Sequence, residues 1–404
     1  MNYYLRCINC KREYKPDEVL YTCPACGDRL GILEILFHYD EIRIDRTAFR
    51  SGANIWQFQP LLPIGKLGYK THLHVGGTPL YNFADYRGLK NLSIKYEGGN
   101  PSGSFKDRAS AIAVFKAIEE GYNSIFCAST GNAASSLSTI AAPTKLSTYI
   151  FLPATAPIAK LSQMYVHGAN VIPIDGSYDQ AFDISLEIGK QKEWYCRNSA
   201  INPYLLEGKK TCAMEIAVDC NWNLPDVVVV PVGDGTVISS FYKGFYDLLN
   251  VGLIEKVPKI IGVQAKGSNA VKQTFEKGEP FRPIDTNAST IADSISVGKP
   301  RDVIKACRYV NASGGFFVEV EDEKILEASL NMARKFGVFG EPAGATALSG
   351  LDKLIDDGLI KEDEHVCVIV SGNGLKDIKA VERFVNVEKI KPTAEDVLDY
   401  LNNG

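Results

Sequence analysis

Short apolar segments that are typical of strands alternate with longer amphipathic segments that are typical of helices over most of the chain. The clearest apolar segment is the valine run at 226–231, which indicates a strand covered on both faces. Strands of this kind, separated by helices, predict an α/β protein with mainly parallel sheets. The expected strands are 92–96, 124–128, 147–152, 170–174, 226–231, 259–263, 316–320 and 365–370. The expected helices are 109–120, 156–167, 178–192, 209–219, 237–249, 322–336, 343–356 and 393–402, with an alanine-rich helix after 132.

A lysine lies in the turn that joins the first of these strands to its helix. Residues 100–108 read NPSGSFKDR, so Lys106 follows a proline-glycine turn at the mouth of the helix. The positive end of a helix and its free N–H groups favour anionic groups nearby, and Ser102 or Ser104 could cap the turn. The same field lowers the pKa of a lysine and favours the neutral amine, which is the form that reacts with a carbonyl group. Taken alone, the motif also fits a surface lysine after a capped turn.

Three more polar turns follow expected strands at their carboxyl ends, where open α/β sheets bind ligands. They are STGN at 129–132, GDGT at 233–236 and SGNG at 371–374. The GDGT turn suits a phosphate group held by backbone N–H groups, although the carboxylate of Asp234 is an awkward neighbour for a dianion. Each turn alone could equally be a plain connection between a strand and a helix.

Four of the ten cysteines have the spacing C-x2-C-x12-C-x2-C: Cys7, Cys10, Cys23 and Cys26. Two close pairs on turns can present four thiolates tetrahedrally to zinc. Four thiolates leave no open position on the metal, so the zinc would be structural and would fold a piece too small to bury its own core. Four unligated cysteines or two short disulfides are the alternatives, and a reducing cytosol disfavours the disulfides.

Length and charge narrow the classes of protein to consider. A chain of 404 residues is long enough for two domains, and a formal net charge of −4 gives no sign of nucleic-acid binding. No segment has the apolar length of a signal peptide or a membrane span. We therefore expect a cytoplasmic protein without membrane or nucleic-acid partners. Lys11, Arg12 and Lys15 are too few to make the cysteine segment a nucleic-acid binder.

Together and in order, these motifs resemble those of the threonine synthase family, which belongs to the fold-type II pyridoxal-phosphate enzymes (the tryptophan synthase β family). The resemblance covers nearly the whole chain and includes CASTGNAA at 127–134, NSAINPY at 198–204, EGKKT at 207–211, EPAGA at 341–345 and SGNGLKD at 371–377. It implies a two-domain fold plus the zinc-ribbon-like segment. By this resemblance, residues 1–30 form the zinc-ribbon-like segment, 31–110 with 200–404 the large cofactor-binding domain, and 111–199 a smaller mobile α/β domain.

The resemblance also implies a role for individual residues. Lys106 would hold pyridoxal 5′-phosphate covalently and later move protons at the substrate carbons. Ser371 would face the pyridine nitrogen, and its neutral hydroxyl would leave that nitrogen largely unprotonated, which suits eliminations and replacements. The implied binding residues are Asn132, Gly233, Asp234, Gly235, Thr236 and Ser371 for the cofactor, and Ser129, Thr130, Gly131 and Asn202 for the amino-acid substrate.

The activity implied is conversion of O-phospho-L-homoserine and water into L-threonine and phosphate by a homodimer. Two departures from the family's motifs leave other activities open. Leu205 stands where the family usually has an arginine that helps to bind the substrate's phosphate, so Lys209, Lys376 or Arg108 would have to supply the cation. The GDGT turn replaces a common Gly-Asn-x-Gly-Asn turn. The alternatives are a sister enzyme that performs β-elimination or β-replacement on a serine- or threonine-like substrate, and a non-catalytic relative.

Overall fold

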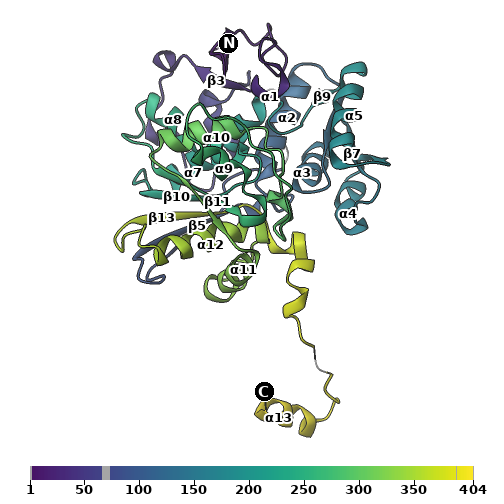
Figure 1. The fold of residues 1–404 in the computed structure, drawn as a ribbon, viewed down its shortest axis with the longest axis vertical. Coiled ribbons are helices and arrows are strands. Elements are labelled where there is room, and N and C mark those ends of the chain that lie inside the picture. The colour runs from purple at the N-terminus through teal and green to yellow at the C-terminus, as the bar shows by residue number, and fades with distance from the viewer. Residues whose placement is uncertain (1, 66–72, 388, 404) are drawn as a thin grey trace.

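The computed structural model describes residues 2–65, 73–387 and 389–403 and arranges their strands in three sheets (Figure 1). The largest sheet has six strands in the order β12-β11-β10-β13-β5-β4, and only the edge strand β4 runs antiparallel to its neighbour. Its strands are β4 (Leu80–Phe83), β5 (Asn91–Tyr96), β10 (Val227–Pro231), β11 (Lys259–Ala265), β12 (Phe317–Val320) and β13 (His365–Val370). The helices that pack around it are α7 (Thr211–Asp219), α8 (Thr236–Asn250), α9 (Ala270–Glu276), α10 (Val303–Ala312), α11 (Asp322–Phe336) and α12 (Pro342–Asp356).

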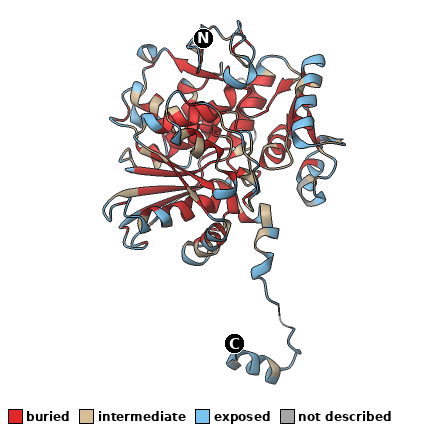
Figure 2. Cartoon of the chain, in the orientation of Figure 1, coloured by how far each residue is buried: buried red, intermediate tan, exposed pale blue. Residues whose placement is uncertain are grey.

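The central strand β10 is covered on both faces, as its run of valines predicts. Val228 and Val230 belong to one buried cluster together with Phe241 of α8. Val227 and Val229 belong to a second cluster together with residues of α12. Successive side chains of a strand point to opposite faces, so an unbroken valine run supplies both cores at once. In Figure 2 the strands β10, β11 and β13 of this sheet are almost entirely buried, whereas no residue of the edge strand β4 is buried.

A second sheet has four parallel strands in the order β8-β7-β6-β9. Its two faces also belong to separate hydrophobic clusters: Ile125 lies in one cluster with residues of α3, whereas Phe126 lies in another with Phe182 of α5. The strands are β6 (Ser124–Ala128), β7 (Ser147–Pro153), β8 (Asn170–Ile174) and β9 (Tyr195–Cys196). The neighbouring helices are α2 (Lys106–Glu119), α3 (Asn132–Ala141), α4 (Ile158–Val166) and α5 (Tyr178–Gln191). The predicted α/β fold with mainly parallel sheets is therefore confirmed.

The amino-terminal segment forms a small antiparallel sheet in the order β2-β1-β3. This sheet is fastened to α10, where Tyr309 donates to a carboxylate oxygen of Glu34 at 2.5 Å and Lys305 donates to the carbonyl oxygen of Leu33 at 3.1 Å. Arg308 donates to the carbonyl oxygen of Ile8. The elements of the segment are β1 (Tyr3–Cys7), β2 (Glu13–Tyr14), α1 (Gly27–Leu30) and β3 (Leu33–Phe37).

Several elements differ from the expectation. Helix α2 begins at Lys106 itself, and the helix expected at 209–219 is α7, which is preceded by a short helix, α6 (Tyr204–Lys209), that was not expected. Helices α9 and α10 were not predicted at all. Helix α10 is amphipathic, and its Lys305 and Arg308 turn toward the amino-terminal sheet, where they donate to the carbonyl oxygens of Leu33 and Ile8.

The carboxyl-terminal helix α13 (Ala394–Asn403) extends away from the rest of the molecule (Figure 1). It exposes the apolar side chains of Val397, Leu398 and Leu401. Within the described residues, none of the helices combines the length and the apolar character that a membrane span requires.

Candidate functional site

A cavity of about 790 Å³ lies where the carboxyl ends of β6, β10 and β13 meet the start of α2, and we call it the lysine cavity. It brings together turns that are far apart in the sequence. The predicted site residues that line it are Lys106, Ser129, Thr130, Gly131, Asn132, Gly233, Asp234 and Ser371. The remaining predicted residues, Gly235, Thr236 and Asn202, are not among the residues that line it.

Backbone pairing holds the lysine turn against the turn that contains Ser371. The N–H of Phe105 donates to the carbonyl oxygen of Ser371 at 2.9 Å, and Ser104 and Gly372 form an antiparallel bridge. Lys106 therefore begins α2 directly beside the end of β13. Neither Ser102 nor Ser104 caps the helix.

The amine of Lys106 is chemically available. Among the described residues no hydrogen bond or ion pair to this amine is found. Burial lowers the pKa of Lys106, and the carboxylates of Asp234 and Glu341 only partly oppose that effect. A buried lysine with a lowered pKa supplies the neutral amine that a carbonyl compound needs as a nucleophile.

The turn at 129–132 opens α3 and presents donors to the cavity. The N–H of Gly131 donates to the hydroxyl of Ser129 at 3.1 Å, and the free N–H groups at the start of α3 favour an anion. The side-chain amide of Asn132 donates to Glu341 at 2.9 Å and to the hydroxyl of Ser294 at 3.1 Å. Burial raises the pKa of Glu341 even though Asn132 donates to it.

The GDGT turn forms a cup at the start of α8. Gly235 has a φ of 98°, and a Cβ atom there would lie 3.0 Å from the carbonyl oxygen of Asp302, so only glycine fits. The carboxylate of Asp234 accepts from the N–H and the hydroxyl of Thr236, at 3.0 and 2.9 Å. Burial disfavours this carboxylate, but Lys209 and Lys106 hold its pKa below the usual value. The Asp234 carboxylate, which would repel a phosphate in the turn, is thus hydrogen-bonded to the first residue of α8.

A buried cation supports the cup from behind. Lys209 donates to the hydroxyl oxygen of Thr236 at 2.7 Å. Burial lowers the pKa of Lys209 to about 7 against the opposing charge of Asp234, with smaller lowering contributions from Lys106 and Arg197. The sequence indicated Lys209 only as one possible replacement for a missing arginine. The cavity-lining residues that received no individual role from the sequence include Tyr178, Arg197, Ser294 and Glu341.

The other suggested replacements for that arginine are already engaged. Arg108 is fully buried and bridges Glu97 and Glu215, so it is not available to bind a ligand. Lys376 donates to the carbonyl oxygen of Ser102 at 2.8 Å and to two further side chains. Leu205 is 1% exposed and packs in the core, away from the cavity lining.

Asn202 fixes the turn that leads into α6. Its side-chain amide donates to the carbonyl oxygen of Cys196 at 2.8 Å, and its side-chain oxygen accepts from the N–H of Tyr204 at 2.9 Å. Both ends of this side chain are bound within the protein. Its role toward the substrate stays a prediction.

The four amino-terminal cysteines converge on one point. The sulfur atoms of Cys7, Cys10, Cys23 and Cys26 all lie within 4.8 Å of one another, and those of Cys10 and Cys23 are 3.7 Å apart. A tetrahedral zinc site with Zn–S distances of about 2.3 Å has edges of about 3.8 Å. The cluster therefore has the donors and the spacing to hold a metal ion.

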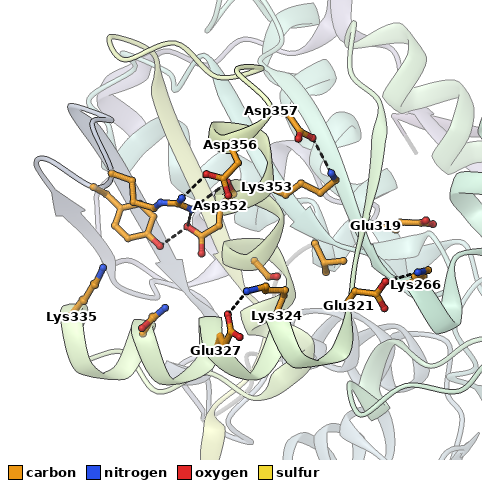
Figure 3. A pocket seen from close by; sticks show the side chains of 15 residues that line it. Lys266, Glu319, Glu321, Lys324, Glu327, Lys335, Asp352, Lys353, Asp356 and Asp357 are labelled. Atoms are coloured by element: carbon orange, nitrogen blue, oxygen red, sulfur yellow. Dashed lines mark hydrogen bonds and ion pairs between the residues drawn. The ribbon is translucent and has the colours of Figure 1, made fainter.

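A second pocket, of about 690 Å³, lies over α11 and α12, and we call it the outer pocket (Figure 3). Its charges are largely neutralised by neighbours. Lys324 pairs with Glu327 at 2.7 Å, and Lys353 pairs with Asp357 at 2.9 Å. Such exposed pairs are ordinary surface features and do not by themselves indicate a ligand.

Known proteins resemble this chain in sequence and in fold. Residues 71–372 match the family model described as pyridoxal-phosphate dependent enzyme. Threonine synthase from Methanocaldococcus jannaschii is 39% identical over 394 residues, which cover 95% of this chain and 96% of that protein. Threonine synthase from Methanosarcina acetivorans is also 39% identical, over 94% of this chain and 93% of that protein. Threonine deaminase isoform 2 from Solanum lycopersicum shares the fold, with a TM-score of 0.63 at 22% identity over 76% of this chain and 87% of that chain. The chain therefore belongs to the threonine synthases, within the family of pyridoxal-phosphate dependent enzymes.

Proposed function

We propose that this enzyme converts O-phospho-L-homoserine and water into L-threonine and inorganic phosphate. The observation that carries the proposal is the lysine cavity, which brings Lys106 together with the three other polar turns that the sequence predicted to bind ligands. The cavity's donor set also fits pyridoxal phosphate. The start of α8 and the Gly235 turn offer N–H groups to a phosphate, and Ser371 lies beside the lysine turn.

Bound pyridoxal phosphate supplies an electron sink that makes protons at the α- and β-carbons of an amino acid easier to remove. We assign covalent attachment of the cofactor and proton transfer at those carbons to Lys106. Ser129, Thr130 and Gly131 would bind the substrate carboxylate at the start of α3. Asn132 would orient the cofactor through its phenolic oxygen, and Ser371 would lie against the pyridine nitrogen.

Water has to be excluded from the cavity except where it adds at the β-carbon. We propose that residues 111–199 move as a smaller domain over the remainder, 31–110 with 200–404, and close the cavity. The segment contributes Ser129–Asn132 and Tyr178 to the lining, so its movement would change access directly.

The proposal is tested by a paired assay of phosphate and threonine. Cofactor-loaded protein receives O-phospho-L-homoserine, and Lys106→Ala serves as the inactive variant. Lys266→Ala, in the outer pocket, is the matched lysine control. We expect equal amounts of threonine and phosphate from the wild type and from Lys266→Ala, and none from Lys106→Ala. A wild-type protein that binds the cofactor but releases neither product would exclude this function.

One observation favours a second candidate, elimination or replacement at the β-carbon of a serine- or threonine-like substrate. The side chain of Leu205 is buried in the core, so position 205 offers no cation to a substrate phosphate. Such an enzyme would release ammonia and a 2-oxo acid from L-serine or L-threonine, or exchange the β-substituent. Turnover of these amino acids, without turnover of O-phospho-L-homoserine, would establish it.

We further propose that Cys7, Cys10, Cys23 and Cys26 bind a structural zinc ion. The support is the spacing of their sulfur atoms and the small size of the sheet they join. We expect a single zinc ion per chain by elemental analysis. Cys23→Ser should lose that zinc and loosen β1–β3 in hydrogen exchange, while Cys220→Ser, outside the cluster, should keep it. An unchanged exchange pattern after zinc loss would contradict a structural role.

We also propose a cytoplasmic homodimer. The exposed apolar side chains of Val397, Leu398 and Leu401 on α13 support association, because they gain from being covered. Light scattering on the purified holoenzyme, compared with a chain ending before α13, tests the proposal. A monomer in both forms would contradict it.

A further inference from the structure

Arg197 is a buried cation in the lysine cavity that has no anionic partner among the described residues. It directly follows β9, its side chain is 0% exposed, and it is one of the residues that line the cavity. Its Nε donates to the hydroxyl of Ser110 at 3.1 Å. The contacts of its two terminal nitrogens, to the hydroxyl of Ser199 and to the carbonyl oxygen of Lys106, are both long at 3.5 Å.

This arrangement differs from the other fully buried arginine. Arg108 reaches the carboxylates of Glu97 and Glu215 at 2.7 and 2.6 Å. Within the described part of the chain, Arg197 has no carboxylate at ion-pairing distance. An isolated buried charge is costly unless it is paired, so the two terminal nitrogens of Arg197 lack the anion that would justify their burial.

The ligands of the proposed reaction bring three anionic groups to the cavity. The cofactor phosphate has the start of α8, supported by Lys209. The substrate carboxylate has the start of α3 at Ser129–Gly131. The substrate's own phosphate cannot use Leu205, which is apolar, or Arg108, which is bound elsewhere. Of the other cations that line the cavity, Lys299 pairs with Asp179 at 3.6 Å and Arg301 lies over the ring of Phe182 at 3.7 Å.

We propose that Arg197 binds the phosphate group of the substrate and thereby replaces the arginine that is absent at position 205. The inference rests on the proposed function, since it assumes a phosphorylated substrate. A guanidinium fits this task because its two terminal nitrogens can donate side by side to two phosphate oxygens. Phosphate released by the reaction would occupy the same place. Arg197 thus selects for substrates with a phosphate leaving group and acts as a specificity residue.

The test uses the holoenzyme with Arg197→Met, which keeps the length but not the charge, and Arg197→Lys, which keeps the charge but not the paired donors. Arg46→Met is the matched control, because Arg46 likewise has no carboxylate at ion-pairing distance among the described residues. It donates to the carbonyl oxygen of Leu253 and lies outside the lining of the cavity. The Kd of inorganic phosphate is measured by phosphorus NMR titration. The KM and kcat for O-phospho-L-homoserine and the Kd of the cofactor are measured on the same preparations.

We expect Arg197→Met to raise the phosphate Kd and the KM on the order of 10- to 100-fold, with a smaller rise for Arg197→Lys. The cofactor Kd should stay unchanged in both variants, and Arg46→Met should match the wild type in every measurement. If Arg197→Met does not fold, the loss of phosphate affinity in Arg197→Lys decides the question.

Two results would overturn the inference. A raised cofactor Kd with an unchanged phosphate Kd would mean that Arg197 serves the cofactor's phosphate. Unchanged values for both ligands would mean that Arg197 is structural. Failure of the proposed function looks different: the wild type would make no threonine, yet phosphate would still bind to the holoenzyme in a manner that depends on Arg197.

Discussion

The outer pocket and the lysine cavity have similar volumes, about 690 and about 790 Å³, but they treat charge in opposite ways. In the outer pocket, Arg87 reaches the carboxylates of Asp352 and Asp356 at 3.2 and 2.5 Å, and all three side chains are in contact with solvent (Figure 3). In the lysine cavity, Lys106 and Arg197 have no carboxylate at ion-pairing distance among the described residues. Exposed, paired charges cost little free energy of folding. Buried, unpaired charges are costly, so their presence indicates a function such as binding an anion.

This difference explains why the number of charged side chains around a pocket is a poor guide to function. Four of the five cations in the outer pocket pair with carboxylates, and the fifth, Lys335, lies over the ring of Tyr86 at 5.5 Å. The pocket offers no unsatisfied charge to a ligand. Around the lysine cavity, burial lowers the pKa values of Lys106, Arg197 and Lys209. Each of these groups gains when an anion enters.

The largest effect is expected where a buried charge loses its partner. Arg108→Met would leave the carboxylates of Glu97 and Glu215 without their arginine beside the start of α2. Breaking a buried pair in this way typically costs about 3–5 kcal/mol. We expect a clearly lower midpoint in urea unfolding of the holoenzyme, and a lower Tm. A midpoint within experimental error of the wild type would show that burial does not determine how much an ion pair contributes to stability. The contrast between the two pockets would then not hold.

A smaller effect should separate Lys209 from the lysines of the outer pocket. The pKa of Lys209 is about 7, so above pH 7 this side chain must take up a proton to pair with a phosphate in the cup. The affinity for pyridoxine 5′-phosphate, which has no aldehyde to react with Lys106, should therefore fall between pH 7 and 9 by up to about tenfold per pH unit.

In Lys209→Met the affinity should be lower at pH 7 and should change less with pH, because the proton uptake is gone. Lys266→Met, which removes an exposed lysine that pairs with Glu321 at 2.5 Å, should keep the wild-type slope. Fluorescence titration of the apoprotein gives both values. Equal slopes in the wild type and in Lys209→Met would show that Lys209 does not respond to the phosphate.

The sequence predicted the strands and turns that form this site well, because they follow from local sequence patterns. The valine run of β10 predicted a doubly covered strand, and the polar turns after β6, β10 and β13 predicted where ligands gather. Both depend on local patterns that survive in any α/β fold. The spacing of the four cysteines likewise predicted their convergence.

The charges around the site could not be predicted in the same way. Nothing beside Arg197 in the sequence indicates that it is buried without a carboxylate, because that depends on Ser110 and Lys106, which lie more than eighty positions earlier in the chain. Arg108 was one of the cations expected to bind the substrate's phosphate, but the structure pairs it with Glu97 and Glu215. Ion pairing depends on tertiary structure. A sequence can therefore indicate which cationic side chains are candidates for binding an anionic ligand, but not which of them are free of carboxylate partners.

The smallest effect is expected at Arg87, which completes the comparison with Arg108. Both arginines bridge two carboxylates, but Arg87 is 36% exposed while Arg108 is 0% exposed. Water and salt replace most of an exposed pair, so Arg87→Met should cost less than about 1 kcal/mol and leave catalysis unchanged. Its unfolding midpoint, measured beside that of Arg108→Met and again in 1 M salt, isolates burial as the variable. If Arg87→Met were as destabilising as Arg108→Met, the ion pairs of the outer pocket would stabilise the fold as much as buried ones do. The two regions would then differ in whether their charges are paired, and not in whether they are buried.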